Sequence, residues 1–120
     1  MQFGITLKMM SMTSYARNDI ILVRYPFSDL SSSKVRPAVI VNTQHISQDL
    51  IITPLTSKTA SLLDGEFVLS DWETAGLNVT TAVKRGFYTV HESLVVKVIG
   101  KLGDADAAEL DRSLRGWLGI

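Results

Sequence analysis

The sequence contains no cysteine, only two histidines that lie far apart, and only three prolines. Without cysteine the chain forms no disulfide and no thiolate metal site, and two distant histidines offer no ligand cluster for a metal. It also lacks a glycine-rich phosphate loop and a nucleophile elbow. We therefore expect a protein that works without a metal or other cofactor.

Long apolar runs are absent as well. No stretch approaches the roughly 20 apolar residues that a membrane-spanning helix requires, and the first residues, MQFGITLKMMSM, lack the longer apolar core of a secretory signal. Residues 1–17 contain four methionines and little periodicity, so we expect a loosely ordered N-terminal tail. The sequence thus predicts a cytoplasmic protein that makes no membrane contact.

Basic and acidic side chains are equal in number. The 120 residues fit one domain, and their formal net charge is zero, whereas strong nucleic-acid binders usually carry a basic excess. The charges are nevertheless uneven, because residues 1–63 carry six basic and three acidic side chains and residues 64–120 carry six basic and nine acidic ones. Both a local basic patch for a phosphate backbone and an ordinary mixed surface agree with this distribution.

The stretch 18–41 reads NDIILVRYPFSDLSSSKVRPAVIV, and the remaining residues are arranged around it. Residues 20–25 and 38–43 are short runs rich in β-branched side chains, which predict two strands with a polar loop between them. Pro26 and Pro37 would cut any helix here into pieces too short to be stable. We therefore expect a loop held between two fixed strands.

Further short strands follow along the chain. Turn formers separate them, and Pro54 is expected to interrupt the third. One or two helical turns from Asp71 to Ala75 should end at Gly76, and Gly100 should permit a bend or a close approach. Trp72 is expected to pack in the core, with base stacking as the alternative. The predicted strands cover residues 50–53, 66–69, 79–83, 87–90 and 95–102.

The clearest helix begins at Asp104, a good N-cap, and Asp106 suits the positive end of its dipole. An apolar stripe at helical spacing should pack on the sheet. Together these elements predict a mainly β fold, a small curled antiparallel sheet or barrel with a C-terminal α-helix. The stripe consists of Ala107, Leu110, Leu114, Trp117 and Leu118.

Two polar segments carry the candidate site. Arg36 stands at a strand entrance where Pro37 fixes the backbone, and its guanidinium fork suits phosphate. Thr56, Ser57 and Lys58 supply hydroxyls and a cation at a strand end, which by itself is also an ordinary loop opening. His45, in a polar turn, is read either as a proton-transfer group or as an exposed turn residue. The loop before Arg36 adds Ser28, Asp29, Ser31, Ser32, Ser33 and Lys34.

NDIILVRYPFSD followed by KVRPAVIV resembles the opening of the PemK/MazF-like toxins of bacterial toxin-antitoxin systems. DLIITPLTSK, AGLNVTTAV and VIGKLGDADAAELDRSLRGWLGI look like the later blocks of that family, in the same order. The resemblance spans residues 18–120 and rests on the order and spacing of the blocks. It implies a toxin domain over these residues.

The family implies the SH3-like barrel of the MazF, Kid and CcdB toxins, and a homodimer with it. The near-continuous apolar runs 20–23 and 94–99 agree with a dimer, because they suggest strands that are buried on both faces. The family further implies a cognate antitoxin protein as partner, and binding of operator DNA only as the toxin-antitoxin complex.

By the same resemblance the chain would be a metal-independent endoribonuclease that cleaves single-stranded mRNA. Arg36 would neutralise the charge on the scissile phosphate and protonate the leaving 5′-oxygen, while Thr56 would orient the phosphate. The remaining candidates are substrate-binding residues, namely Ser57, Lys58, Ser33, Lys34 and Asp29.

The sequence departs from the family in two places. Asn18-Asp19 replaces a Gly-Asp pair, and residues 83–86 read VKRG where several relatives have an acidic residue. If that acid is the general base in those relatives, its role here falls to Asp29 or to a water. Two other functions stay open, a gyrase-directed toxin of the same fold and a barrel that binds nucleic acid without cutting it.

Overall fold

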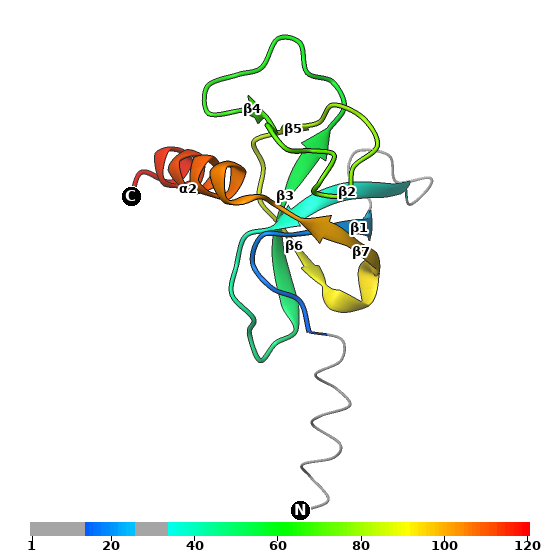
Figure 1. The fold of residues 1–120 in the computed structure, drawn as a ribbon. Helices are drawn as coiled ribbons and strands as arrows, with labels where there is room; N and C mark the ends of the chain where they lie inside the picture. The colour runs from blue at the N-terminus through cyan, green and yellow to red at the C-terminus, as the bar shows by residue number, and fades with distance from the viewer. Residues whose placement is uncertain (1–13, 26–33) are drawn as a thin grey trace, which may run out of the picture.

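The computed structural model describes residues 14–25 and 34–120, and these form one antiparallel sheet with a C-terminal helix (Figure 1). The strand order is β4-β5-β3-β2-β1-β7, and β6 pairs with β3 beside this path. The sheet is strongly curled but not closed, since β4 and β7 are its two ends. The elements are β1 (Asp19–Tyr25), β2 (Lys34–Ile40), β3 (Asp49–Thr56), β4 (Phe67–Val68), β5 (Ala82–Val83), β6 (Tyr88–His91), the 3₁₀ helix η1 (Glu92–Leu94), β7 (Val95–Lys101) and α2 (Asp104–Leu118).

The predicted fold class, mainly β with a C-terminal helix, is confirmed. Two of the predicted elements, a strand and a short helix, differ from the structure. The β-strand at 79–83 is reduced to β5, and the predicted helix after Asp71 is a turn whose backbone bonds include Ala75 N–H to the Asp71 carbonyl. Five residues with no apolar periodicity are too few to hold a helix by themselves.

Two prolines set the limits of one strand pair. Contrary to the prediction, β2 already begins at Lys34 and β3 runs through Pro54 to Thr56. The β2–β3 ladder nevertheless covers only three residue pairs, from Ala38–Pro54 to Ile40–Ile52. Both prolines thus stand where the ladder ends, which is where a residue without a backbone donor is tolerated in a sheet.

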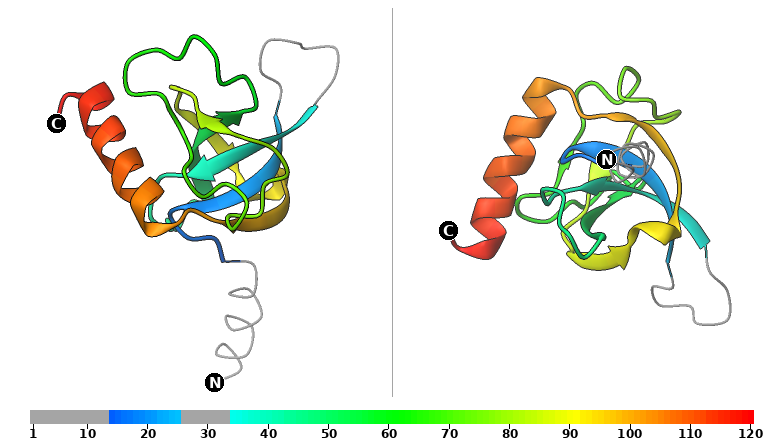
Figure 2. Two further views of the ribbon diagram at one scale, coloured as in Figure 1. Left: turned by 45° about the horizontal axis from the view of Figure 1, so that its top comes forward. Right: turned by 90° about the horizontal axis from the view of Figure 1, so that it is seen from below.

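The core consists of two apolar clusters on opposite faces of β1 and β2. Ile20 and Val39 join Leu110 and Leu114 of α2 in one cluster, so the helix covers this face of the sheet (Figure 2). Ile21 belongs to the other cluster, which the curled strands enclose. Alternate residues of β1 therefore enter different clusters, as the prediction of burial on both faces required.

The prediction that the apolar run 94–99 is buried on both faces is wrong, because Val96 and Val98 of β7 are 46% and 45% exposed. β7 is an edge strand, and among the described residues no further strand covers it. In α2, Ala107, Leu110, Leu114 and Trp117 pack as the apolar stripe predicted, whereas Leu118 at the end of the helix is exposed.

The helix α2 is hydrogen-bonded to the residues that follow β4. Gly103, not Asp104, is its N-cap, while Asp106 lies in the first turn of the helix, at the positive end of its dipole, and is buried there. The Asp106 carboxylate accepts bonds from the Ser70 N–H at 2.9 Å, the Ser70 hydroxyl at 3.0 Å and the Asp71 N–H at 3.1 Å. These bonds satisfy a buried charge and hold α2 against the sheet.

A close backbone contact fixes the turn at residues 71–76. Gly76 has φ +98°, and a Cβ on it would lie 2.2 Å from the Ile99 carbonyl oxygen. A Cβ on Gly100 would lie 1.8 Å from the Ala75 carbonyl oxygen. Only glycine allows the turn to lie directly on β7, so the predicted close approach at Gly100 is confirmed.

Residues 1–13 and 26–33 lie outside the described part of the chain, and with them most of the predicted tail and of the serine-rich loop. The described residues 14–17 contact the domain. Tyr15 packs against the second apolar cluster, and Arg17 forms an ion pair with Asp111 at 3.2 Å.

We expect opposite effects of the same substitution at two glycines. Gly100→Ala should lower the free energy of unfolding by about 1–3 kcal/mol, because its Cβ must displace backbone. Gly116→Ala, in α2 with nothing within 4 Å of a Cβ, should raise it by about 0.5–1 kcal/mol. Urea unfolding measures both, and equal effects would contradict the proposed close contact.

A second matched pair tests two buried threonines. The Thr53 hydroxyl meets no hydrogen-bond partner among the described residues, whereas the Thr81 hydroxyl donates to the Val79 carbonyl at 2.8 Å. Thr53→Val should therefore raise the free energy of unfolding by about 1 kcal/mol, and Thr81→Val should lower it by about the same amount. A destabilised Thr53→Val protein, measured by urea unfolding, would refute the first assignment.

Candidate active site

A cleft of about 820 Å³ opens beyond the end of the β2–β3 ladder. Past Pro37 and Pro54 the two strands no longer pair, and β3 turns to pair with β5. The floor of the cleft comes from β1, β2 and β7, and its walls come from residues 55–58 and the loop 76–81. The cleft therefore depends on the point at which the two prolines stop the ladder.

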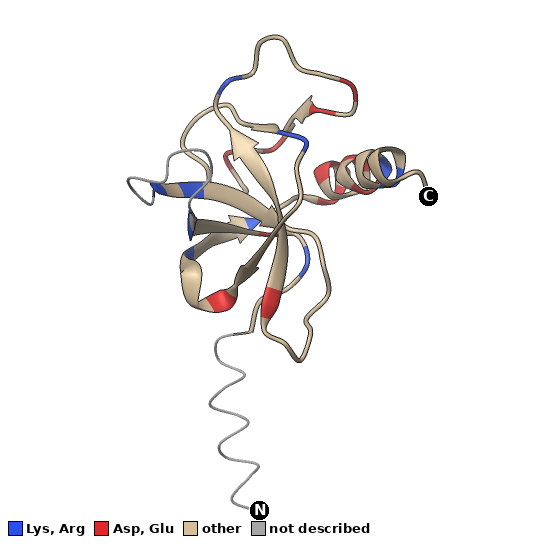
Figure 3. Cartoon of the chain, turned by 180° about the vertical axis from the view of Figure 1, so that it is seen from behind, with Lys and Arg blue, Asp and Glu red and all other residues tan. Residues whose placement is uncertain are grey.

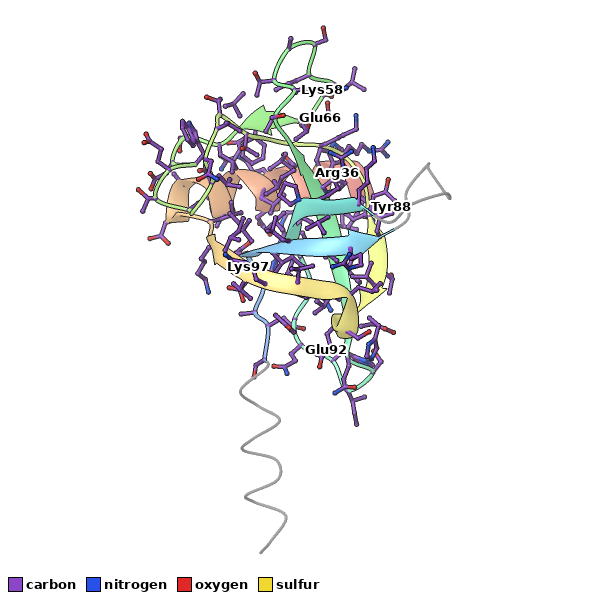
Figure 4. The ribbon with its side chains drawn as sticks, turned by 90° about the vertical axis from the view of Figure 1, so that its right-hand side faces the viewer. Arg36, Lys58, Glu66, Tyr88, Glu92 and Lys97 are labelled. Atoms are coloured by element: carbon purple, nitrogen blue, oxygen red, sulfur yellow. The ribbon has the colours of Figure 1, made fainter. Side chains whose placement is uncertain are left out.

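Arg36 and Thr56 meet in this cleft, as predicted. Both residues line it, although twenty positions separate them along the chain. The β2–β3 ladder brings the two residues into one cleft, because it ends at the pair Ala38–Pro54, two residues along each strand from Arg36 and from Thr56. In Figure 4, Arg36 lies at the end of β2 and Lys58 lies above it on the loop after β3.

The Thr56 hydroxyl is oriented by its own loop. Its Oγ1 accepts a hydrogen bond from the backbone N–H of Lys58 at 3.0 Å. With one lone pair used in this way, the hydroxyl proton is directed to another acceptor, and the half-buried side chain lines the cleft. Thr56 is thus placed as a hydrogen-bond donor to a bound group.

The charges that line the cleft are all positive. Arg36, Lys58 and Lys97 are its charged residues, and no carboxylate is among the described residues that line it. Figure 3 shows basic colour at the outer end of β2, whereas α2 carries both acidic and basic colour. A cleft with three cations, a threonine donor and an apolar floor suits an anion that also has apolar surface.

The cleft brings together some of the predicted site residues and not others. Ser57 and Lys58, predicted as substrate-binding residues, line the cleft, whereas Lys34, exposed on β2, does not. Ser33 and Asp29 lie outside the described residues. Asn78 and Lys97 were missed, because one stands in a linking segment and the other in a strand, and neither position carries a motif.

Both histidines have local structural roles. His45 is exposed in its turn, and its Nδ1 lies 2.9 Å from the Ser47 hydroxyl oxygen, which confirms the interpretation as a turn residue. His91 caps η1 by accepting from the Ser93 N–H. Neither lines the cleft.

A carboxylate from a different segment, that of Glu66, contacts residues 83–86. Glu66 accepts hydrogen bonds from the Arg85 N–H at 2.9 Å and from the Leu63 N–H at 2.7 Å. These two bonds, the one from Arg85 foremost, lower the pKa of Glu66. Glu66 does not line the cleft, so it fastens the loop that follows Lys58 and is not placed as a base.

Within residues 14–25 and 34–120, no three side chains of histidine, aspartate or glutamate gather as a ligand set for a metal ion. Over the same residues, no helix has the length and apolar character to span a membrane.

Comparison with known proteins gives a family and a fold. A family model described as PemK-like, MazF-like toxin of type II toxin-antitoxin system matches residues 16–118. No curated protein sequence matches the chain. The structural matches below are all under 25% identical, so they show a shared fold alone.

Three solved structures illustrate the likeness. An endoribonuclease from a mycobacterial species, in complex with its cognate antitoxin, has TM-score 0.73 and 15% identity, covering 89% of this chain and 97% of that one. MazF from Deinococcus radiodurans has TM-score 0.70 and 18% identity, covering 88% and 97%. The Mycobacterium tuberculosis toxin MazF-mt6 has TM-score 0.68 and 17% identity, covering 85% and 97%.

Glu66→Gln should weaken the dependence of the free energy of unfolding on pH in the acidic range. A lowered pKa means that the Glu66 carboxylate stabilises the fold above the pKa of an unfolded glutamate and that this contribution is lost as pH falls through its folded pKa. The variant should therefore be less stable than wild type at neutral pH, and the difference should shrink below about pH 4. Urea unfolding across this range is the measurement, with exposed Glu73→Gln as the control; a difference that grows in acid would contradict the assignment.

Proposed function

The chain belongs to the PemK-like, MazF-like toxin family of type II toxin-antitoxin systems, and from this we propose that it is a metal-independent endoribonuclease that cleaves single-stranded mRNA. The observation that carries the proposal is the meeting of Arg36 and Thr56 in one cation-lined cleft. A guanidinium and a hydroxyl donor opposite each other match the two non-bridging oxygens of a phosphodiester.

The reaction needs few groups, because RNA supplies its own nucleophile. The 2′-oxygen attacks phosphorus and loses its proton to a base, while the bond to the 5′-oxygen breaks and that oxygen takes up a proton. The products are a 2′,3′-cyclic phosphate, which water can open, and a 5′-hydroxyl end. Arg36 and Thr56 stabilise the extra negative charge on the phosphate in the transition state.

Proton transfer divides between the protein and the solvent. Arg36 gives a proton to the leaving 5′-oxygen as the bond to phosphorus breaks, and it regains its own proton and charge from water. The described residues that line the cleft include no histidine and no carboxylate that takes the 2′-hydroxyl proton. That proton goes to a water, or to Asp29 in the part of the chain that is not described.

The assembly belongs to the same proposal. The endoribonuclease from a mycobacterial species was solved with its cognate antitoxin, and we propose an antitoxin protein as the partner that silences this chain. We further propose a homodimer, for which the exposed apolar side chains of β7 offer surface, operator DNA binding only by the toxin-antitoxin complex, and a cytoplasmic location.

Purified protein incubated with a long mixed-sequence RNA in EDTA tests the proposal. We expect cleavage with new 5′-hydroxyl ends, since the chemistry requires no metal. RNA binding without any product would instead favour a non-catalytic nucleic-acid-binding protein. The absence of both binding and cleavage would favour a toxin that acts on a protein target, such as gyrase.

Arg36→Ala should lower the rate of RNA cleavage by roughly 100-fold or more, as removal of a transition-state donor does. Thr56→Val, which keeps the side-chain shape, should lower it as well. Arg112→Ala is the matched control, because Arg112 is exposed on α2 and does not line the cleft. Single-turnover cleavage measures the rates, and a folded Arg36→Ala protein that cleaves like wild type would refute the site.

A further inference from the structure

Lys97 is the one charged residue of the cleft that comes from β7. It reaches the cleft because of a register shift in the β1–β7 ladder. Ile20 pairs with Gly100, but Ile21 pairs with Val98 and Leu22 with Lys97. An unshifted ladder would have put Val98 opposite Leu22. The irregularity therefore brings Lys97 beside Leu22, which itself lines the cleft.

Three strands form the floor from Lys97 to the β2 side of the cleft. Leu22 pairs with Lys97 on one side and with Pro37 on the other, so these three residues form a row across β7, β1 and β2. Directly opposed residues share a face of a sheet. The row spans about 10 Å, two strand spacings, and Figure 4 shows Lys97 on the far side of β1 from Arg36.

Lys97 is not engaged elsewhere within the described part of the chain. It forms no ion pair there and is exposed. Lys101, four residues later on the same strand, pairs instead with Asp19 at 3.7 Å. An exposed cation beside an apolar floor, with no carboxylate near it in the cleft lining, is placed to bind an anion from outside.

We propose that Lys97 binds a backbone phosphate of the RNA other than the one that is cleaved, so that the substrate crosses the cleft from Arg36 to β7. This inference rests on the ribonuclease function proposed above. Leu22 and Pro37, which follow Lys97 across the floor toward β2, favour a polynucleotide over a small anion, because bases have apolar faces and the phosphates beside them are charged. Lys97 is thus a substrate-positioning residue with no part in bond breaking.

Lys97→Gln should therefore change binding and leave the chemical step unchanged. For a 2′-O-methyl RNA of mixed sequence, which cannot be cleaved, we expect Kd to rise roughly threefold to tenfold and the slope of log Kd against log salt to fall by about 0.7. For cleavable RNA, KM should rise and kcat should stay at the wild-type value. Lys97→Arg keeps the charge and should retain wild-type binding and salt slope.

Lys101→Gln is the matched control, since this lysine lies on the same strand but outside the cleft lining. Equal losses for Lys97→Gln and Lys101→Gln would overturn the inference, because they would reflect net charge alone. A Lys97→Gln protein with wild-type Kd and salt slope would also overturn it, while wild-type cleavage and the Arg36→Ala defect would leave the proposed function standing. If wild-type protein neither binds nor cleaves RNA, the function itself is refuted.

Discussion

The contact between Gly76 and Gly100 is the constraint on which the cleft depends most. It lets the backbone of the turn at 71–76 lie directly on β7, with carbonyl oxygens where side chains would otherwise begin. The turn leads into the loop 76–81, so this contact sets the distance between one wall of the cleft and its floor. Any side chain at either glycine would push the wall away from the strand that carries Lys97.

The opposite wall depends on where hydrogen bonding stops. Because the β2–β3 ladder ends at Pro37 and Pro54, neither of which has a backbone N–H to leave unpaired, the two strands can part there, and β3 continues toward β5. The separated strand ends then hold Arg36 and Thr56 at the opening. The sheet thus positions both groups.

Sequence reasoning went furthest where local chemistry decides the outcome. The presence of two strands in the stretch 18–41, the helix from 104 and the close approach at Gly100 were all predicted, because period, capping and glycine leave a local signal. Lys97 and Glu66 were not found. Lys97 faces the cleft through an irregularity in strand pairing, and Glu66 accepts a hydrogen bond from the backbone N–H of Arg85, 19 residues later. Such relations between distant segments leave no periodic trace in the sequence.

The helix α2 holds the segments on both sides of β4, and this has a consequence for how the chain can vary in evolution. Ser113 donates to the Gly65 carbonyl and Trp117 to the Asp64 carbonyl, while Asp106 accepts from the backbone of Ser70 and Asp71. The helix therefore grips main-chain atoms, which every amino acid possesses. Apart from Gly65, where the Trp117 ring leaves no room for a Cβ, and Glu66, whose carboxylate accepts from two backbone N–H groups, the exposed side chains of the segment leading on from Lys58 can be exchanged during evolution while the segment keeps its place.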